Sequence, residues 1–406
     1  MSSDALYNKL NRFQSLIAER PSVSEAKKPP EHYQRMADAL EGELVLNHVG
    51  SFVLKKTSYS SLYSHGQLTL GDLAVNDELP HSAFTRLEEP GSFSLSSVLF
   101  VDTETTGLGG TGTVAFVVGC GSVVEDGFEV RQYVMPDYSD EAAMLEALLN
   151  EFRQDRVVIS YNGAAFDLPV LRSRMIVNRV DREIPMKGHN DLLHSTRRLF
   201  RRRLGDCSLP NIERELFDFH RVDDVPGYLI PSIYFDWLSE QKPDGLISVL
   251  EHNRMDIVSL FFLAGYITRA FDTEGGILET VDDLHSLSRI YGWRKDNDRI
   301  ANLYRRMETV NGQPLADDVL LFHAQAFKRT GDYDKAVTIW ERLSASTSKE
   351  GFWANVELAK FYEHQAKDIE KAYHYAAKAD NMGTLSKSHR RQVEKRLSRL
   401  SSKRTG

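Results

Sequence analysis

Four short apolar stretches between residues 98 and 162 constrain the fold of this chain more than any other feature. They are rich in β-branched residues and are separated by turns containing Gly and Asp. These stretches predict strands at VLFVD (98–102), TVAFVVGCG (113–121), EVRQYVMP (129–136) and RVVISYN (156–162). Residues 141–152 have helical spacing, and helical segments dominate from residue 167 onward. This order predicts an α/β domain with a mixed sheet over residues 96–272.

The sequence before residue 96 carries weaker signals. An amphipathic helix is expected over residues 6–17, and weak alternation at 43–54 and 60–70 suggests a small β element. Residues 1–95 are therefore treated as an N-terminal region without an assigned role.

The last third of the chain contains a helical repeat. Aligning residues 320–343 with 354–379 pairs Ala324 with Ala359 and Phe327 with Tyr362, each 35 residues apart. A poorer copy occupies 284–307. This period resembles tetratricopeptide helical hairpins and predicts an all-α repeat domain over residues 280–400, a surface for a protein partner. A plain helical bundle with chance similarity is the alternative.

Composition excludes several classes of protein. The chain has 50 Lys and Arg against 58 Asp and Glu, a formal charge of −8, so no overall attraction to nucleic acid or anionic membranes is expected. Its two cysteines are far apart, which excludes a disulfide framework. No apolar run is long enough to span a bilayer and no signal-peptide core is visible, so a cytoplasmic location without membrane contact is predicted.

Acidic residues occur at three unusual places. Asp102 and Glu104 end the first strand and, two residues apart, point to the same side. Asp167 follows the buried strand at 156–162, and Asp256 lies four residues after His252 on an apolar helix. Carboxylates are ligands that Mg²⁺ and Mn²⁺ prefer. Separately, these acids have simpler interpretations as solvated strand-end charges, a helix N-cap at Asp167 and a helix-surface pair at His252 and Asp256.

Together the acidic segments resemble the DEDD superfamily of 3′–5′ exonucleases, which have a ribonuclease-H-like fold. Asp102 and Glu104 match the first motif, Asn162, Phe166 and Asp167 the second, and Asp256 the third. His252 departs from the pattern, because it is a histidine at the spacing of the tyrosine branch, four residues before the last acid. The resemblance implies two bound Mg²⁺ or Mn²⁺ ions held by the four acids, with His252 assisting the attacking water.

A closer resemblance, to bacterial YprB-like ribonuclease-H-like proteins, covers nearly the whole chain. It rests on GLGGTGTVAFVVGCG (107–121), on residues 189–231 including DDVPG, and on HNRMD (252–256). The resemblance implies a metal-dependent nuclease acting on DNA or RNA, followed by tetratricopeptide-like helices. A catalytically inactive nuclease fold that serves as a scaffold, binding protein partners or nucleic acid through its helical repeats, is the alternative.

Weaker candidates surround these motifs. Thr105 and Asn162 are candidates for substrate contact, as are Arg197 and Arg201 in the one dense basic cluster, whose alternative is a solvated helix face. Asp191 is expected to be structural. Gly107 to Gly112 fit the G-x-G-x-x-G pattern, but a β-rich segment follows where a nucleotide-binding site needs a helix, so a turn beside the metal site is predicted instead.

Overall fold

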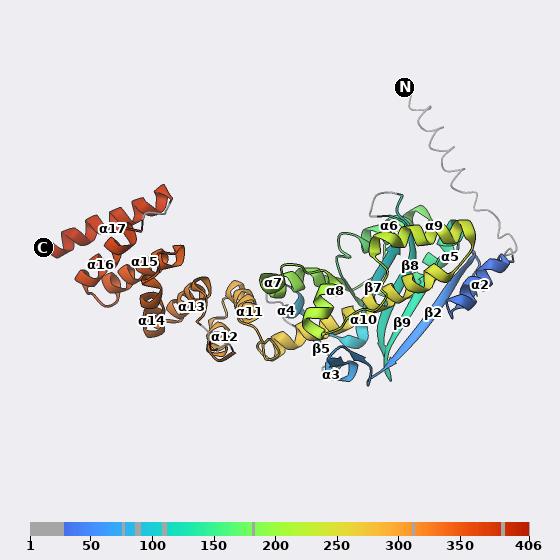
Figure 1. Ribbon diagram of the computed structural model, residues 1–406, viewed down its shortest axis with the longest axis horizontal. Helices are drawn as coiled ribbons and strands as arrows, with labels where there is room; N and C mark the ends of the chain where they lie inside the picture. The colour runs from blue at the N-terminus through green and yellow to red at the C-terminus, as the bar shows by residue number, and fades with distance from the viewer. Residues whose placement is uncertain are drawn as a thin grey trace, which may run out of the picture. The chain divides into compact units, whose positions relative to one another are not determined.

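The structure is a computed structural model that describes residues 28–74, 78–85, 91–107, 112–180, 183–310, 312, 314–382 and 386–405 (Figure 1). The helix expected over residues 6–17 lies outside these ranges. The chain divides into two compact units. The first comprises Met1–Phe84, Gly91–His194 and Ser208–Tyr266, and the second Thr85–Pro90, Ser195–Cys207 and Ile267–Gly406.

A mixed seven-stranded sheet forms the centre of the first unit, as the sequence predicts. Its order is β1-β2-β9-β8-β7-β10-β11. Neighbours from β1 to β7 are antiparallel, whereas β10 runs parallel to both β7 and β11. The strands are β1 (Glu43–Leu46), β2 (Ser51–Ser60), β7 (Val98–Thr105), β8 (Ala115–Val124), β9 (Gly127–Val134), β10 (Val157–Ser160) and β11 (Gly188–Asp191).

Helices and two small sheets complete this part of the chain. The small sheets pair β3 (Ser64–His65) with β4 (Leu68–Thr69) and β5 (Glu78–Pro80) with β6 (Ser92–Ser94). The helices are α2 (Glu31–Ala39), α3 (Leu70–Ala74), α4 (His81–Phe84), α5 (Glu141–Leu149), α6 (Asp167–Val177), α7 (Leu192–Leu204), α8 (Leu209–Ile212), α9 (Ile230–Glu240) and α10 (Asp244–Asp272).

Helix α10 packs unusually close to the sheet, across which it runs in Figure 1. A Cβ atom at Gly119 of β8 would lie 2.3 Å from Asn253 Oδ1 and 2.9 Å from Ile257 Cγ1, and one at Gly121 would lie 2.5 Å from Ile257 Cγ2. These glycines let the helix approach the strand. Phe261 continues the contact against Phe100 of β7. The close packing holds α10 beside the strand that carries Asp102 and Glu104.

The sheet extends further toward the N-terminus than the sequence suggested. Strand β2 pairs with β9 from Val53–Val134 to Ser60–Gly127, and β1 pairs with β2. Both strands precede residue 96, where the sequence predicted the α/β domain to start. Apolar and polar residues alternate only weakly along β2, which includes Lys55 and Lys56, so its sequence did not predict this pairing. The strand is held in the sheet by backbone hydrogen bonds to β9, which do not depend on side-chain polarity.

The second unit is all-helical. Its helices are α11 (Val281–Arg294), α12 (Asn297–Val310), α13 (Asp317–Thr330), α14 (Tyr333–Ser344), α15 (Lys349–His364), α16 (Ile369–Asp380) and α17 (Lys387–Thr405). Consecutive helices pack against each other. The positions aligned in the sequence repeat, including Ala324 and Ala359, are buried. The paired helices confirm the all-α class, whereas the tetratricopeptide assignment stays a prediction.

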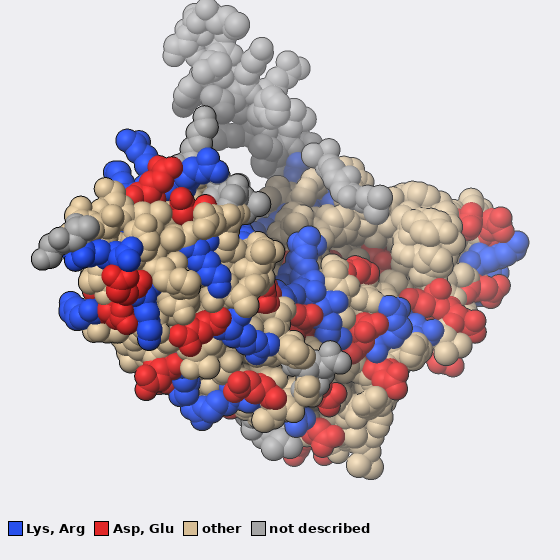
Figure 2. Space-filling model, turned by 60° about the vertical axis from the view of Figure 1, so that its left-hand side comes forward, with Lys and Arg blue, Asp and Glu red and all other residues tan. Residues whose placement is uncertain are grey.

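Two surface properties bear on the sequence expectations. Lys and Arg side chains are interspersed with Asp and Glu over the face drawn in Figure 2, in keeping with a net charge of only −8. Among the helices that the structure describes, none is both long and apolar enough to cross a membrane.

Candidate metal centre

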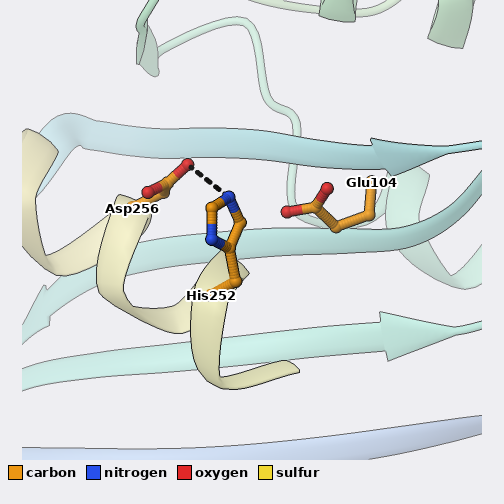
Figure 3. A group of neighbouring side chains, drawn as sticks. All are labelled: Glu104, His252 and Asp256. Atoms are coloured by element: carbon orange, nitrogen blue, oxygen red, sulfur yellow. Dashed lines mark ion pairs between the residues drawn. The ribbon is translucent and has the colours of Figure 1, made fainter. Parts of the chain in front are cut away.

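Strand β7 and helix α10 bring three of the predicted site residues together. Glu104, His252 and Asp256 each offer one ligand atom, and these atoms all lie within 4.8 Å of one another (Figure 3). His252 and Asp256 are one helical turn apart, with His252 Nε2 3.8 Å from Asp256 Oδ2. Glu104 reaches them from β7, so the cluster exists only because α10 packs on this face of the sheet.

Asp102 is fixed by the same helix. Its Oδ2 accepts a hydrogen bond of 2.9 Å from Asn253 Nδ2. The Oδ1 of Asn253 in turn accepts a hydrogen bond of 3.0 Å from Gln132 Nε2. Asn253 is fully buried. Asn253, which lies between the predicted catalytic residue His252 and the predicted ligand Asp256, thus ties α10 to β7, a role that its position in HNRMD did not indicate.

Asp167 is the first residue of α6, and the N-cap position before it is occupied by Phe166. The N-cap interpretation is therefore wrong. Its Oδ1 instead accepts a 2.6 Å hydrogen bond from Thr103 Oγ1, which joins the start of α6 to β7 between Asp102 and Glu104. The structure places the Asp167 carboxylate next to the strand that carries the first two acids.

The four acids act on one another electrostatically. Burial raises the pKa of Asp102 well above its usual range, and the charges of Asp256, Glu104 and Asp167 add to that rise. Burial also raises the pKa of Glu104 to about 8 and that of Asp167 to about 6. Without a compensating cation, Asp102 and Glu104 hold protons near neutral pH, because several buried carboxylates cannot all be charged close together.

At His252, the charges of neighbouring carboxylates have a larger effect on the pKa than burial does. Burial would lower the pKa of its imidazole, but Asp256 and Glu104 outweigh burial and raise it. Its Nδ1 lies 2.7 Å from Oδ1 of Asp224. The Asp224 contact orients the ring and leaves Nε2 on the side of Asp256.

A buried arginine, not identified from the sequence, completes the surroundings. Arg221 donates to Glu213 Oε1 at 2.6 Å and to Glu213 Oε2 at 2.7 Å, and it is also hydrogen-bonded to Asp256. Its Nη1 lies 3.4 Å from His252 Nδ1. The motif DDVPG contains Asp224, three residues after Arg221, and was the only sequence signal for this segment. Arg221 and Asp224 therefore hold Asp256 and His252 through these contacts.

Asp191 is structural, as expected. At the end of β11 it accepts hydrogen bonds from the backbone amides of Asn162 (2.8 Å), Ala164 (3.1 Å) and Leu193 (3.0 Å). Asn162 has a positive φ of 65°. Asp191 thus fixes the tight turn that leads from β10 to Asp167.

Of the weaker substrate-contact candidates, Thr105 and Asn162 belong to the first unit and Arg197 and Arg201 to the second. Thr105 is buried and donates to the Gly107 carbonyl at 2.7 Å. Asn162 lies in the turn held by Asp191. Arg197 and Arg201 are exposed on the part of α7 that belongs to the second unit. Within the same cluster Arg202 pairs with Asp282 and Asp318, so part of this basic face serves ion pairs among the helices.

The glycine-rich segment after β7 leads into a strand. Residues 108–111 lie outside the described ranges, and β8 pairs antiparallel with β7 from Phe100–Gly121 onward. The nucleotide-binding arrangement would need a helix here, so the strand predicted over residues 113–121 is confirmed.

The comparison with protein families agrees with this fold. Residues 99–268 match the ribonuclease H superfamily. The chain is 30% identical over 357 residues to the uncharacterized protein YprB of Bacillus subtilis (strain 168), covering 86% of each chain. The family B DNA polymerase of Pyrobaculum calidifontis gives a TM-score of 0.34 at 14% identity, over 75% of this chain and 36% of the polymerase. On the strength of the match to YprB, the chain belongs to the YprB family, with a ribonuclease H superfamily domain over residues 99–268.

Proposed function

We propose that the chain is a divalent-metal-dependent nuclease that hydrolyses phosphodiester bonds in DNA or RNA, as a 3′–5′ exonuclease of the DEDD type. One observation carries the proposal: the convergence of Glu104, His252 and Asp256 next to Asp102 and Asp167 in a ribonuclease H superfamily domain. A scaffold would gain nothing from buried acids that repel one another, since such a cluster costs folding free energy.

The chemistry of these side chains fits Mg²⁺ or Mn²⁺. Carboxylate oxygens are the hard ligands that both ions prefer. Burial raises the pKa values of Asp102, Glu104 and Asp167, and a bound cation would favour their charged forms. These three acids and Asp256 would hold two ions. When bound, such ions neutralise the charge of the scissile phosphate and make water more acidic.

His252 would take the proton of the attacking water. Neutral imidazole accepts protons near neutral pH, and Asp224 at Nδ1 leaves Nε2 to do so. With cations held by Glu104 and Asp256, the neutral ring is favoured because like charges repel. Arg221 acts through its hydrogen bond to Asp256, which it holds in place.

Four further residues are assigned to contact with the nucleic acid. Thr105 ends β7 and Asn162 follows β10, and we assign both to substrate contact. Arg197 and Arg201 are exposed and would meet phosphates of the bound strand.

The test is cleavage of nucleic acids labelled at the 5′ or the 3′ end, single- and double-stranded, with Mg²⁺ or Mn²⁺. The full-length protein is compared with Asp102→Asn and Asp256→Asn, and with Asp236→Asn as a control on the exposed surface of α9. A ladder that shortens from the 3′ end and is lost only in the site variants would support an exonuclease. Internal cuts lost in those variants would support a nuclease but contradict the 3′–5′ polarity. Absence of cleavage that depends on these acids would contradict the proposal and favour the scaffold.

A further inference from the structure

The helical unit contains two cavities that lie side by side along α15. One, of about 320 Å³, is lined by residues of α15, α16 and α17, and the other, of about 200 Å³, by residues of α13, α14, α15 and α17. Lys360 and Arg396 line both, so the cavities adjoin at these two side chains. We call the two cavities together the α15 groove.

The floor of the α15 groove is apolar. The larger cavity is lined by Phe352, Val356, Ala359, Ala376 and Val393, all of them buried. Its volume is sufficient for one or two large apolar side chains of a partner. Filling it would remove apolar surface from water, which is favourable.

Cations outnumber anions around this floor. Glu363 is fully buried and accepts hydrogen bonds from Arg396 (2.5 Å), Arg399 (2.7 Å) and Lys403 (3.0 Å). Glu357 is shared in the same way by two cations, Lys328 and Lys360. Each glutamate therefore leaves positive charge uncompensated beside the groove. Helix α17 adds to it, because eight of its residues are Lys or Arg and only Glu394 is acidic, in a protein whose net charge is −8.

A buried donor in the smaller cavity lacks an acceptor. Trp340 is fully buried, lines this cavity, and has no hydrogen-bond partner for Nε1 within the described part of the chain. The indole N–H is a donor only, and a buried donor without a partner is destabilising. A carbonyl or carboxylate oxygen of a ligand would satisfy it.

We propose that the α15 groove binds an acidic peptide segment of a partner protein, with one or two apolar side chains in the larger cavity and its carboxylates on the surrounding cations. Apolar anchors between acidic residues match both the floor and the charge of the groove. A nucleic acid backbone would match the charge but would leave the apolar floor unfilled. The proposal is independent of the nuclease function, because every residue that carries it lies in the helical unit.

The probe is the fluorescein-labelled peptide EDELLDEFDE, whose binding to the full-length protein is followed by fluorescence anisotropy. The peptide EDESSDESDE keeps the charges but lacks the anchors. The variant Lys395→Ala/Arg399→Ala removes two groove cations and leaves Glu363 with Arg396 and Lys403. The matched control, Arg390→Ala/Arg391→Ala, removes the same charge from exposed positions of α17 that do not line the groove. Trp340→Phe removes the indole N–H while keeping an aromatic ring.

We expect roughly tenfold weaker binding for Lys395→Ala/Arg399→Ala and for the serine peptide, and less than about twofold for the control variant. Trp340→Phe should weaken binding about threefold or more. If both double variants lose the same affinity, or if the two peptides bind equally well, binding depends on the overall charge of α17 and not on the groove. Either result would overturn the proposal. Tighter binding of fluorescein-labelled oligo-dT in EDTA, lost in the same groove variant, would overturn it in favour of nucleic acid.

Discussion

Replacing Glu104 by Gln should make the metal-free protein more stable at alkaline pH. The Glu104 carboxyl lies beside Asp256 and His252, and burial raises its pKa from 4.5 to about 8. Gln has nearly the same shape but neither takes up nor releases a proton in this range. The substitution therefore removes one titrating group from the cluster with little change in packing.

The magnitude follows from the raised pKa. The folded protein holds the Glu104 proton more tightly than the unfolded chain does, so the free energy of unfolding falls as pH rises from about 4.5 to about 8. Between about pH 5 and about pH 8 this group alone lowers it by about 3 kcal/mol. The variant should lack this loss. Asp102 and Asp167, whose pKa values are also raised, change stability in the same direction in the wild type.

Hydrogen exchange measured by mass spectrometry on peptides from β7 and β8 isolates the α/β unit from the helical unit. Both proteins are measured in EDTA at about pH 5 and about pH 8, with exchange rates corrected for the intrinsic effect of pH. The difference between wild type and variant is the quantity to compare, because buried histidines such as His65, whose pKa is lowered to about 3, titrate with the opposite sign in both proteins. If Glu104→Gln loses as much stability as the wild type between about pH 5 and about pH 8, the raised pKa of Glu104 in the cluster is refuted.

Three further substitutions test the surroundings of the cluster. Gly119→Ala would place a Cβ 2.3 Å from Asn253 Oδ1, so we expect it to shift α10, cost about 1–3 kcal/mol in urea unfolding and weaken Mn²⁺ binding measured by calorimetry. Arg221→Met would leave the Glu213 carboxylate buried without its partner, which should lower the free energy of unfolding by about 3–5 kcal/mol in the same assay. Adding Glu213→Gln should restore most of this lost stability, and no recovery would contradict the pairing. Asp191→Ala removes the acceptor of three backbone amides, so hydrogen exchange of residues 162–164 should accelerate roughly tenfold or more while exchange of β8 stays unchanged.

The sequence predicted the α/β core because its strands are apolar and bounded by clear turns. Strand β7 occurs where VLFVD indicated it, and the two-residue spacing of Asp102 and Glu104 does put both acids on the side of α10. The pairing of β1 and β2 with this sheet was missed, since β2 carries polar residues and its partner, β9, lies about 75 residues away.

The surroundings of the cluster were harder to foresee. Asp167 looked like a helix cap from its local sequence, and only the fold brings Thr103 within hydrogen-bond distance of it. Arg221 is buried between Glu213, eight residues before it, and Asp256, 35 residues after it. Sequence patterns indicate which residues have suitable chemistry, whereas partners such as Thr103 of Asp167 and Asp256 of Arg221 depend on how α6 and α10 pack.

Calorimetry of Mn²⁺ binding to the full-length protein tests the central claim most directly. Titrations at about pH 7 in buffers of different ionisation enthalpy also count the protons released. We predict saturable binding with proton release, because carboxylates with raised pKa values must lose their protons to hold the ion. Glu104→Gln should bind more weakly and release fewer protons, and Asp236→Asn should match the wild type. Binding without proton release, or no binding that depends on Glu104, would contradict a metal centre at this cluster.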